Sequence, residues 1–244
     1  MARITVVLNR KGGIGKSTIT VNTAAVTADV HGEAPDGDPD YVVAVSIDPQ
    51  GSATWWAERV GDDLPFSFIQ AHTEDHLAGL ADLKKSKKIR HVFVDTPGWA
   101  DISEEEKKRA GDDLGDSAAA KALRAVLAVA DDIIVPIEPE PLGFPPTVTT
   151  IENIIKPRRI PYTVVVSNWD PRDGTADLED TKAFIDRQGW PRANTVIRHY
   201  KVHVRAAAEG QVVTQYAKNR VAMEAREDFF RLALELGAGG KGPR

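Results

Sequence analysis

The stretch NRKGGIGKST, residues 9–18, holds the residue types that proteins use to bind the phosphates of a nucleotide. Its three glycines permit a tight turn in which backbone N–H groups face an anion. Lys16 would neutralise charge on the β- and γ-phosphates, and the hydroxyl of Ser17 would ligate Mg²⁺. Arg10 stands where the usual pattern, G-x-x-x-x-G-K-[ST], has its first glycine, and Lys11 is an additional cation that this pattern does not require.

The segments on either side of this loop give it the context that a phosphate loop needs. The apolar run ITVVL precedes it and a helix-like segment follows it, which predicts strand, loop and helix in succession. The N–H groups at the start of that helix would add to the anion site. We therefore expect a nucleotide to contact Gly12, Gly13, Ile14, Gly15, Lys16, Ser17 and Thr18.

Two aspartates follow other apolar runs. Asp48 comes directly after VVAVSI, residues 42–47, and Asp95 ends HVFVD, residues 91–95. Carboxylates at the carboxyl ends of parallel strands face the ligand crevice of an α/β sheet. We expect Asp95 and Ser17 to hold Mg²⁺, directly or through water. A carboxylate at Asp48 can orient a water near the γ-phosphate.

The identity of the base is addressed by two short motifs. Asn168 ends the run YTVVVSN and offers both a donor and an acceptor, as recognition of adenine requires. Asn168 is followed by Trp and Asp, so the N-K-x-D motif for guanine is missing. Residues 95–98, DTPG, match the D-x-x-G of GTPases, and this match keeps a GTPase interpretation open.

The elements that must position these residues can be read from the hydrophobic pattern. Apolar, mostly β-branched runs predict strands buried on both faces at 4–8, 42–47, 66–69, 91–95, 132–137, 162–168 and 195–197. Helix-like segments occur at 16–30, 117–130, 177–188 and 220–236. The alternation predicts an α/β fold, a P-loop NTPase with a doubly wound, mostly parallel sheet and helices on both faces.

Two segments interrupt this pattern, and the end of the chain departs from it. Residues 31–40 are dense in Pro, Gly and Asp, and residues 101–117 carry seven acids and three bases. We expect both to be surface insertions in a single P-loop nucleotide-binding domain that covers residues 1–236. Residues 237–244, GAGGKGPR, predict a disordered tail.

Composition excludes several classes of protein. The chain of 244 residues has no cysteine, which excludes disulfides, thiol catalysis and cysteine-ligated clusters. It has no run of 18 apolar residues and no signal-peptide layout, so we expect a cytoplasmic protein with no membrane partner. The net charge of −5 gives no nucleic-acid signature, but residues 198–226 carry six Lys/Arg against two Glu. A local basic face is therefore compatible with the acidic average.

Several of these motifs together resemble those of one family. Residues 11–18, KGGIGKST, resemble the deviant Walker A motif K-G-G-x-G-K-[ST]-[ST] of the ParA/MinD group of dimeric ATPases. Asn9 and Arg10 in front of it are similar to the N-x-K-G-G of the ParA branch. Residues 46–56, SIDPQGSATWW, resemble the ParA switch I motif D-x-D-P-Q-G-N-A-T, although Ser46 replaces its first aspartate. The resemblance spans most of the chain.

This resemblance implies an Mg²⁺-dependent ATPase, which hydrolyses ATP to ADP and phosphate and forms a homodimer when ATP binds. Lys11 would reach across the dimer to the partner's nucleotide, whereas Lys16 would serve its own. A cation delivered in trans stabilises phosphoryl transfer only when two subunits meet. The resemblance thus makes Lys11, Lys16 and Asp48 the catalytic residues, with ATP and Mg²⁺ as cofactors, and it implies that Asp48 also helps to bind the metal.

Within the group, the sequence favours a small partition ATPase without an N-terminal helix-turn-helix. The last helix-like segment, 220–236, has a net charge of −1, which is unsuited to anionic lipid and favours a closing helix packed on the sheet. The resemblance then implies a nucleoid-associated protein that segregates plasmid or chromosomal DNA and binds nonspecific double-stranded DNA. A centromere-binding, ParB-like adaptor would stimulate hydrolysis and release it. Our candidates for DNA contact are Arg198, Lys201, Arg205, Arg220 and Arg226.

A second interpretation is open at this point. The chain would be an ATP- or GTP-dependent regulatory or targeting switch that acts through protein contacts without DNA. In that case the acidic residues of 101–117 would form the docking surface. Binding to random duplex DNA with and without ATP separates the two interpretations, and competition between ATP and GTP tests the GTPase interpretation.

Overall fold

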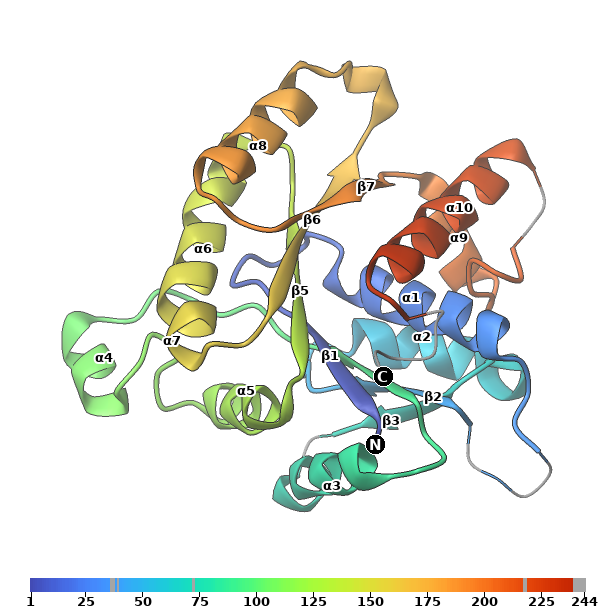
Figure 1. Ribbon diagram of the computed structural model, residues 1–244, viewed down its shortest axis with the longest axis horizontal. Helices are drawn as coiled ribbons and strands as arrows, with labels where there is room; N and C mark the ends of the chain where they lie inside the picture. Colours follow the sequence, from blue (N-terminus) through green and yellow to red (C-terminus); the bar gives the residue numbers. More distant parts are fainter. Residues whose placement is uncertain (36–37, 39, 72, 217–218, 239–244) are drawn as a thin grey trace.

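A seven-stranded sheet, parallel throughout, forms the centre of the structure (Figure 1). The strand order is β3-β2-β4-β1-β5-β6-β7. The computed structural model describes residues 1–35, 38, 40–71, 73–216 and 219–238. The strands are β1 (Arg3–Val7), β2 (Val42–Ser46), β3 (Ser67–Gln70), β4 (His91–Asp95), β5 (Asp132–Ile137), β6 (Tyr162–Trp169) and β7 (Arg192–Arg198).

Helices follow most of the strands and cover both faces of the sheet. They are α1 (Lys16–His31), α2 (Ser52–Val60), α3 (Glu74–Lys85), α4 (Glu104–Ala110), α5 (Ala118–Val129), α6 (Phe144–Thr149), α7 (Lys156–Arg158), α8 (Ala176–Arg187), α9 (Lys201–Ala208) and α10 (Arg220–Glu235). The short turns η1 (Gly61–Asp63), η2 (Pro141–Gly143) and η4 (Pro171–Asp173) are 3₁₀-helical. A π-helical segment, η3 (Thr150–Ile155), joins α6 to α7.

The core has one layer on each face of the sheet. Helices α1, α2, α9 and α10 pack on one face, and α3, α5, η3 and α8 on the other, as the two sides of Figure 1 show. Successive strand residues alternate between these layers: Phe93 packs with the first, Val92 and Val94 with the second. Because both faces are covered, the strands are apolar without interruption. The predicted P-loop NTPase fold with a doubly wound parallel sheet is confirmed.

The boundaries of the predicted elements agree closely with the structure. Each predicted strand overlaps an observed strand, and the four predicted helices lie within two residues of α1, α5, α8 and α10. Strand β7 begins at Arg192, three residues earlier than predicted, because Arg192 pairs with β6 through an irregular register. Of the segment 31–40, residues 36, 37 and 39 lie outside the described residues.

The end of the chain differs in part from the prediction of a disordered tail over 237–244. Ala238 is buried in the core, and its N–H donates to Ala233 O at 2.8 Å. Gly237 adopts a φ of 70°, which ends α10 and turns the chain back onto the sheet. The prediction is therefore wrong for residues 237 and 238, and residues 239–244 lie outside the described part of the chain.

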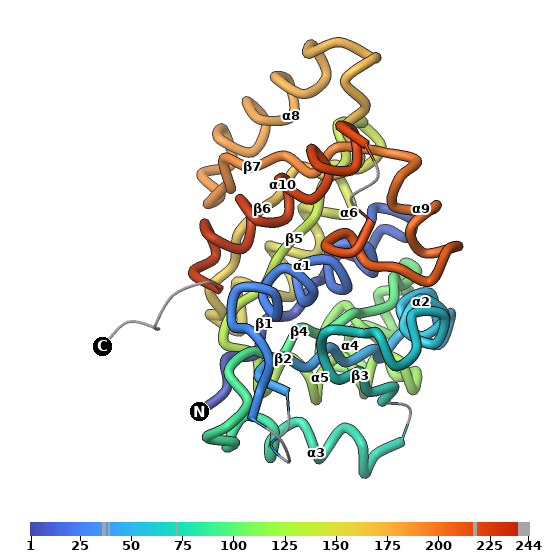
Figure 2. The backbone as a smooth tube through the Cα atoms, turned by 90° about the vertical axis from the view of Figure 1, so that its right-hand side faces the viewer, coloured from blue at the N-terminus to red at the C-terminus, as the bar shows by residue number. Residues whose placement is uncertain are grey.

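Helix α10 packs as the predicted closing helix. It buries Phe229 and Leu232 and lies against β7 and α1, as Figure 2 shows from the side. In the described part of the chain, no helix combines the length and apolar character needed to cross a bilayer.

Candidate functional site

The residues predicted to bind nucleotide and metal lie at one edge of the sheet. Five neighbouring strands, β2, β4, β1, β5 and β6, end at this edge, because parallel strands all point the same way. Asp48 lies just after β2, Asp95 is the last residue of β4, the loop 8–15 follows β1, Glu138 follows β5, and Asn168 is the second-to-last residue of β6. Crossovers from β1 and β4 leave in opposite directions, so the loop lies at a topological switch point, where α/β sheets bind ligands.

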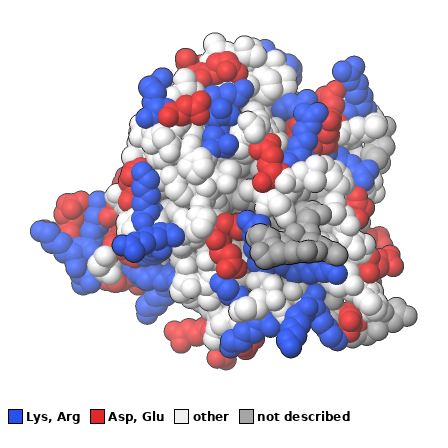
Figure 3. Space-filling model, viewed as in Figure 1, with Lys and Arg blue, Asp and Glu red and all other residues white. Residues whose placement is uncertain are grey.

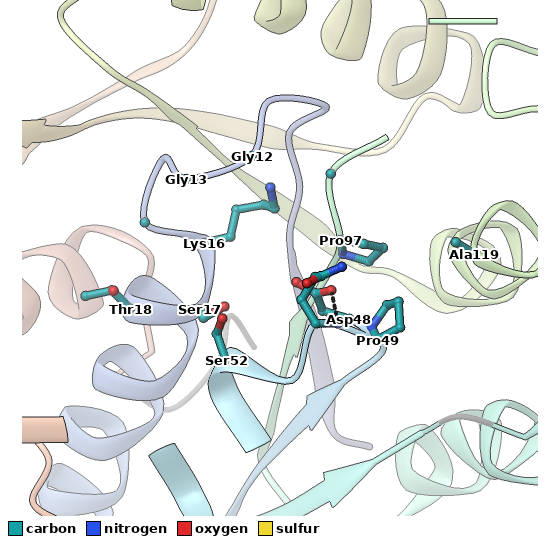
Figure 4. A pocket seen from close by; sticks show the side chains of 13 residues that line it. Gly12, Gly13, Lys16, Ser17, Thr18, Asp48, Pro49, Ser52, Pro97 and Ala119 are labelled. Carbon is teal, nitrogen blue, oxygen red and sulfur yellow. Dashed lines mark hydrogen bonds between the residues drawn. The ribbon is translucent and has the colours of Figure 1, made fainter. Parts of the chain in front are cut away.

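The loop and the start of α1 form one wall of a cleft of about 540 Å³. Gly15, with a φ of 85°, directly precedes α1, whose first turn carries no acidic residue. The free N–H groups of that turn and its positive dipole end therefore face the cleft as an anion site. Lys16 extends beneath the loop, as Figure 4 shows, and Ser17, Thr18 and Asp48 also line the cleft.

The ammonium of Lys16 is held inside the loop. Its Nζ donates to Lys11 O at 2.7 Å, and the residue is 6% exposed. Burial lowers the pKa of Lys16, and the carboxylates of Asp95 and Asp48 partly offset that effect. A phosphate bound in the cleft would stabilise the charged form of Lys16, which burial has removed from water.

Ser17 lines the cleft and contacts the buried Asp95. Ser17 Oγ donates to Asp95 Oδ2 at 2.8 Å, and Asp95 is completely buried. Burial raises the pKa of Asp95 to about 7, against the opposing hydrogen bond from Ser17. Asp95 Oδ1 is buried without a hydrogen-bond partner within the described residues. An orphaned carboxylate oxygen beside a hydroxyl fits a hydrated Mg²⁺, which prefers oxygen ligands and retains several waters.

The donor set is incomplete without a phosphate. No group of three or more His, Cys, Asp or Glu side chains in the described part of the chain is placed to hold a metal. Mg²⁺ would therefore depend on Ser17, on Asp95 or Asp48 through water, and on phosphate oxygens. This is the pattern expected where Mg²⁺ arrives with a nucleotide.

Asp48 enters the cleft from the loop after β2. Its Oδ1 accepts the N–H of Gln50 at 2.9 Å, and its own N–H donates to Ser46 Oγ at 3.3 Å. Ser46 is buried and lies opposite Asp95 in the register of β2 and β4. In the switch I motif that this segment resembles, the first aspartate occupies the position of Ser46. Here the hydroxyl of Ser46 instead accepts the N–H of Asp48 in the turn.

Gly98 has a role in packing that sequence reasoning missed. A Cβ at this position would lie 2.7 Å from Arg10 O and 3.2 Å from Gly12 N. Trp99 N–H also donates to Arg10 O at 3.1 Å. The glycine of DTPG thus lets the segment after β4 lie directly against the phosphate loop. This packing contact explains the glycine at position 98, so the glycine of DTPG does not require the GTPase interpretation.

Lys11 points to a different place from Lys16. Its Nζ lies 2.6 Å from Glu138 Oε2 and 3.5 Å from Glu140 Oε2, and it does not line the cleft. Burial lowers the pKa of Lys11, but the hydrogen bond and charge of Glu138, with those of Glu140, outweigh burial and leave it raised. The extra cation of the loop is therefore paired within its own chain. Ile14 is also absent from the cleft and is buried in the core.

Asn9 anchors the loop from below, another role that the sequence did not reveal. Its buried Nδ2 donates to Pro136 O at 2.8 Å and to Thr147 Oγ1 at 2.9 Å, and its Oδ1 accepts the N–H of Lys11 at 3.0 Å. Thr150, in the π-helical segment, accepts the N–H of Arg10 at 3.0 Å. A polar residue directly after an apolar strand was the available signal for such an anchor.

Asn168 lies beside the loop with its backbone in the left-handed region. Its φ is 57°, and its Nδ2 donates to Gly13 O at 3.2 Å and to Glu138 Oε1 at 2.7 Å. The neighbouring Asp170 is bound by Arg172 and caps η4. Asp170 is therefore already engaged, and no guanine-reading aspartate is offered next to Asn168.

Three of the five DNA candidates are already in ion pairs. Arg198 holds Asp228 at 2.7 Å in a largely buried pair, and Arg226 lies 2.8 Å from Asp29. Arg220 lies 2.8 Å from Glu224 but is 91% exposed in its side chain. Arg198 thus serves to fix α10 on β7. We remove it from the DNA candidates, because contact with phosphate would break a buried pair.

Lys201 and Arg205 are placed differently. Both are exposed on α9, one turn apart, and within the described residues neither forms an ion pair. Val204 between them is also exposed. These two cations are free to meet an anionic surface.

The acidic segment 101–117 is largely neutralised by pairing. Asp112 binds both Arg124 and Arg158 at 2.6 Å, Asp116 binds Arg109 at 2.9 Å, and Asp101 pairs with Arg10. Figure 3 shows Lys/Arg and Asp/Glu side chains interleaved over α4, at the left of that view. The segment therefore does not present the uniform acidic surface that the second interpretation needs. The ion pair with Asp101 also gives Arg10 a structural role, because its guanidinium joins the phosphate loop to this segment.

The chain was compared with known proteins. No protein-family model matches it. It is 34% identical over 234 residues to the maintenance of carboxysome distribution protein A of Gloeobacter kilaueensis, with 96% of this chain and 94% of that protein covered. The protein of the same name from Halothiobacillus neapolitanus is 28% identical over 215 residues, covering 86% of this chain and 85% of the relative.

Solved structures show the same fold at lower identity. The MinD cell division protein of Aquifex aeolicus superposes with a TM-score of 0.69 at 15% identity, covering 99% of both chains. A Cyanothece McdA complex with ATP gives a TM-score of 0.62 at 12% identity, covering 97% of this chain and 96% of the other.

Proposed function

Because the chain belongs to the ParA/MinD family of P-loop ATPases, with the carboxysome distribution proteins as relatives, we propose that it is an ATP-dependent positioning ATPase that acts as a nucleotide-gated dimer. One observation carries this proposal. Lys16, Ser17 and Asp48 line one cleft and Asp95 is buried beside Ser17, whereas Lys11, from the same loop, does not line the cleft. A single subunit therefore has a nucleotide site and one cation that does not serve it.

The roles within the site follow from the geometry. The N–H groups of the loop and of α1 would bind the phosphates, with Lys16 as their fixed cation. Mg²⁺ would supply charge neutralisation on the β- and γ-phosphates. Asp48 would orient the attacking water. Lys11 of a second copy would complete the charge around the γ-phosphate, so that ATP hydrolysis needs two subunits.

ATP is the preferred nucleotide in this proposal. Asn168 offers a donor and an acceptor to a base, and Asp170, the residue that would stand nearest to a guanine-reading position, is engaged by Arg172. The test is Mg²⁺-dependent phosphate release from ATP under competition by GTP. Turnover that GTP suppresses at equimolar concentration would contradict the assignment of ATP.

The proposed cargo is a large assembly moved over nucleoid DNA in the cytoplasm. The dimer would bind double-stranded DNA without sequence preference through Lys201 and Arg205, and an adaptor on the cargo would stimulate hydrolysis. The relatives are named for carboxysome distribution, which favours a protein compartment as cargo. Segregation of plasmid or chromosomal DNA through a ParB-like adaptor is the second candidate, favoured by the ParA-like N-x-K-G-G of residues 9–13.

Purification of the chain from its native cells with its ATP-bound dimer stabilised distinguishes the cargoes. A retained adaptor that binds a defined DNA sequence supports DNA segregation. A retained adaptor that binds a compartment shell supports compartment positioning. Failure of the ATP-bound chain to shift random duplex DNA at low salt would contradict both, because each requires the nucleoid as a track.

A further inference from the structure

The carboxylate of Glu138 joins two residues that the proposed function assigns to the nucleotide. Its Oε2 accepts a hydrogen bond from Lys11 Nζ at 2.6 Å, and its Oε1 accepts one from Asn168 Nδ2 at 2.7 Å. Glu138 directly follows β5, and its side chain is 14% exposed. Binding of phosphate, metal or base gives no reason for an acid in this position.

The contact fixes Lys11 on its own subunit. The ammonium sits between Glu138 and the more distant Glu140, while the backbone N–H of Lys11 donates to Asn9 Oδ1. Lys11 can reach a phosphate in a partner subunit only after the bond to Glu138 breaks. That bond is charge-assisted and largely shielded from water, so it is stronger than an ordinary surface pair.

Glu138 is in turn held from its other side. The two amide hydrogens of Asn168 are both used, one by Glu138 and one by Gly13 O at 3.2 Å. Each oxygen of the Glu138 carboxylate therefore has a partner from a different segment, Lys11 in the loop after β1 and Asn168 in β6. The carboxylate is not free to rotate and follow Lys11 outward.

We propose that Glu138 is a positioning residue that holds Lys11 on its own subunit before two subunits associate. This contact weakens dimerisation, because it must break before Lys11 can reach the partner's nucleotide. This inference rests on the proposed role of Lys11 in trans. Association must supply the free energy that separates Lys11 from Glu138, so part of the binding free energy of the dimer is spent on release. Subunits without ATP gain no phosphate in exchange and stay apart.

The test is the dimer dissociation constant, measured by sedimentation at saturating Mg²⁺ and a non-hydrolysable ATP analogue. Four chains form a double-mutant cycle: wild type, Glu138→Gln, Lys11→Ala and the combination. We expect Glu138→Gln to tighten the wild-type dimer by roughly threefold to thirtyfold, the range for a partly buried charged pair. In the Lys11→Ala background the same substitution should change the constant by less than about twofold, because no lysine remains to be released.

Glu140→Gln is the matched control. It removes the same charge from the same loop, but Glu140 lies 3.5 Å from Lys11 and its side chain is 64% exposed. We expect a smaller change than for Glu138→Gln. Equal changes for the two variants would show that lost negative charge, and not release of Lys11, strengthens the dimer, and would overturn the inference.

Two further outcomes are decisive. An unchanged or weaker Glu138→Gln dimer, or tightening that persists without Lys11, would overturn the inference while leaving the proposed function intact. A wild-type chain that does not dimerise with the ATP analogue would instead contradict the proposed function. If Glu138→Gln lowers the melting temperature, Glu138→Asp replaces it; it keeps the charge but shortens the reach, and should tighten the dimer less than removal of the carboxylate.

Discussion

The Oγ of Ser17, in the first turn of α1, donates a hydrogen bond of 2.8 Å to Oδ2 of Asp95, the last residue of β4. The bond joins the helix that follows β1 to the carboxylate at the end of the neighbouring strand β4, which we propose as a metal ligand. It leaves the other oxygen of Asp95 buried and unpaired within the described residues. The nucleotide-free site is thus built around a carboxyl group that is costly to ionise.

This cost gives a pH dependence to the stability of the nucleotide-free chain. Burial raises the pKa of Asp95 to about 7, above its value in the unfolded chain, so the folded state binds the proton more tightly. The contribution of Asp95 to the free energy of unfolding is fully present below about pH 4 and is lost as the pH rises through about 7. We predict that Asp95→Asn loses less melting temperature than the wild type between pH 5 and pH 8, as measured by calorimetry. Equal losses would show that Asp95 ionises freely.

Substitution of the two lysines of the loop should impair different steps, ATP binding for Lys16 and ATP hydrolysis for Lys11. Lys16→Ala removes the buried cation beneath the phosphates and should weaken ATP binding by about a hundredfold or more. Lys11→Ala leaves the cleft intact, so it should bind ATP within about threefold of the wild type but hydrolyse it at least about tenfold more slowly. Isothermal titration and phosphate release measure the two quantities. Normal turnover of Lys11→Ala would refute a role in trans.

Gly98 should tolerate no side chain. Gly98→Ala places a methyl group 2.7 Å from Arg10 O, so the phosphate loop must move. An overpacking cost of about 1–3 kcal/mol, expressed in the loop, would weaken ATP binding by about fivefold to a hundredfold. Gly79→Ala, in α3 and with no neighbouring atom within 4 Å, is the control and should bind ATP normally. Equal affinity of both variants would show that the contact between Gly98 and the loop is unimportant.

The DNA surface should centre on α9. Lys201→Ala with Arg205→Ala removes two cations that form no ion pair within the described residues. It should reduce the slope of log affinity against log salt by about 2, on random duplex DNA with an ATP analogue. Arg226→Ala breaks the ion pair with Asp29 and should change the slope less. Arg198→Ala should instead lower the melting temperature, because it leaves Asp228 buried without its partner. Unchanged DNA binding by the Lys201/Arg205 variant would show that DNA contacts a different surface of the protein.

The sheet was predictable from the sequence because its strands are buried on both faces and read as uninterrupted apolar runs. For a related reason, the sequence predicted that the loop and the two aspartates lie close together: Asp48 and most of the loop line the cleft, and Asp95 is buried beside Ser17. Each directly follows such a run, and parallel strands bring their ends to one edge. Local pattern and topology together were therefore enough to predict that Lys16, Ser17, Asp48 and Asp95 lie near one another.

What the sequence did not reveal depends on pairing across distant segments. Arg198 reads as a free cation until α10 brings Asp228 to it, and Glu138 reads as a loop acid until Lys11 and Asn168 meet it. The acids of 101–117 likewise look unpaired until Arg124 and Arg158 approach Asp112. No spacing rule encodes such contacts, because they are set by tertiary packing.

The central claim is that ATP gates the association of two subunits. Its most direct test is the molar mass in solution, by light scattering, with no nucleotide, with Mg²⁺·ADP and with Mg²⁺ and a non-hydrolysable ATP analogue. We predict a monomer in the first two states, twice that mass in the third, and a monomer in all three for Lys16→Ala. A mass that is the same in every nucleotide state, whether monomeric or dimeric, would contradict the account.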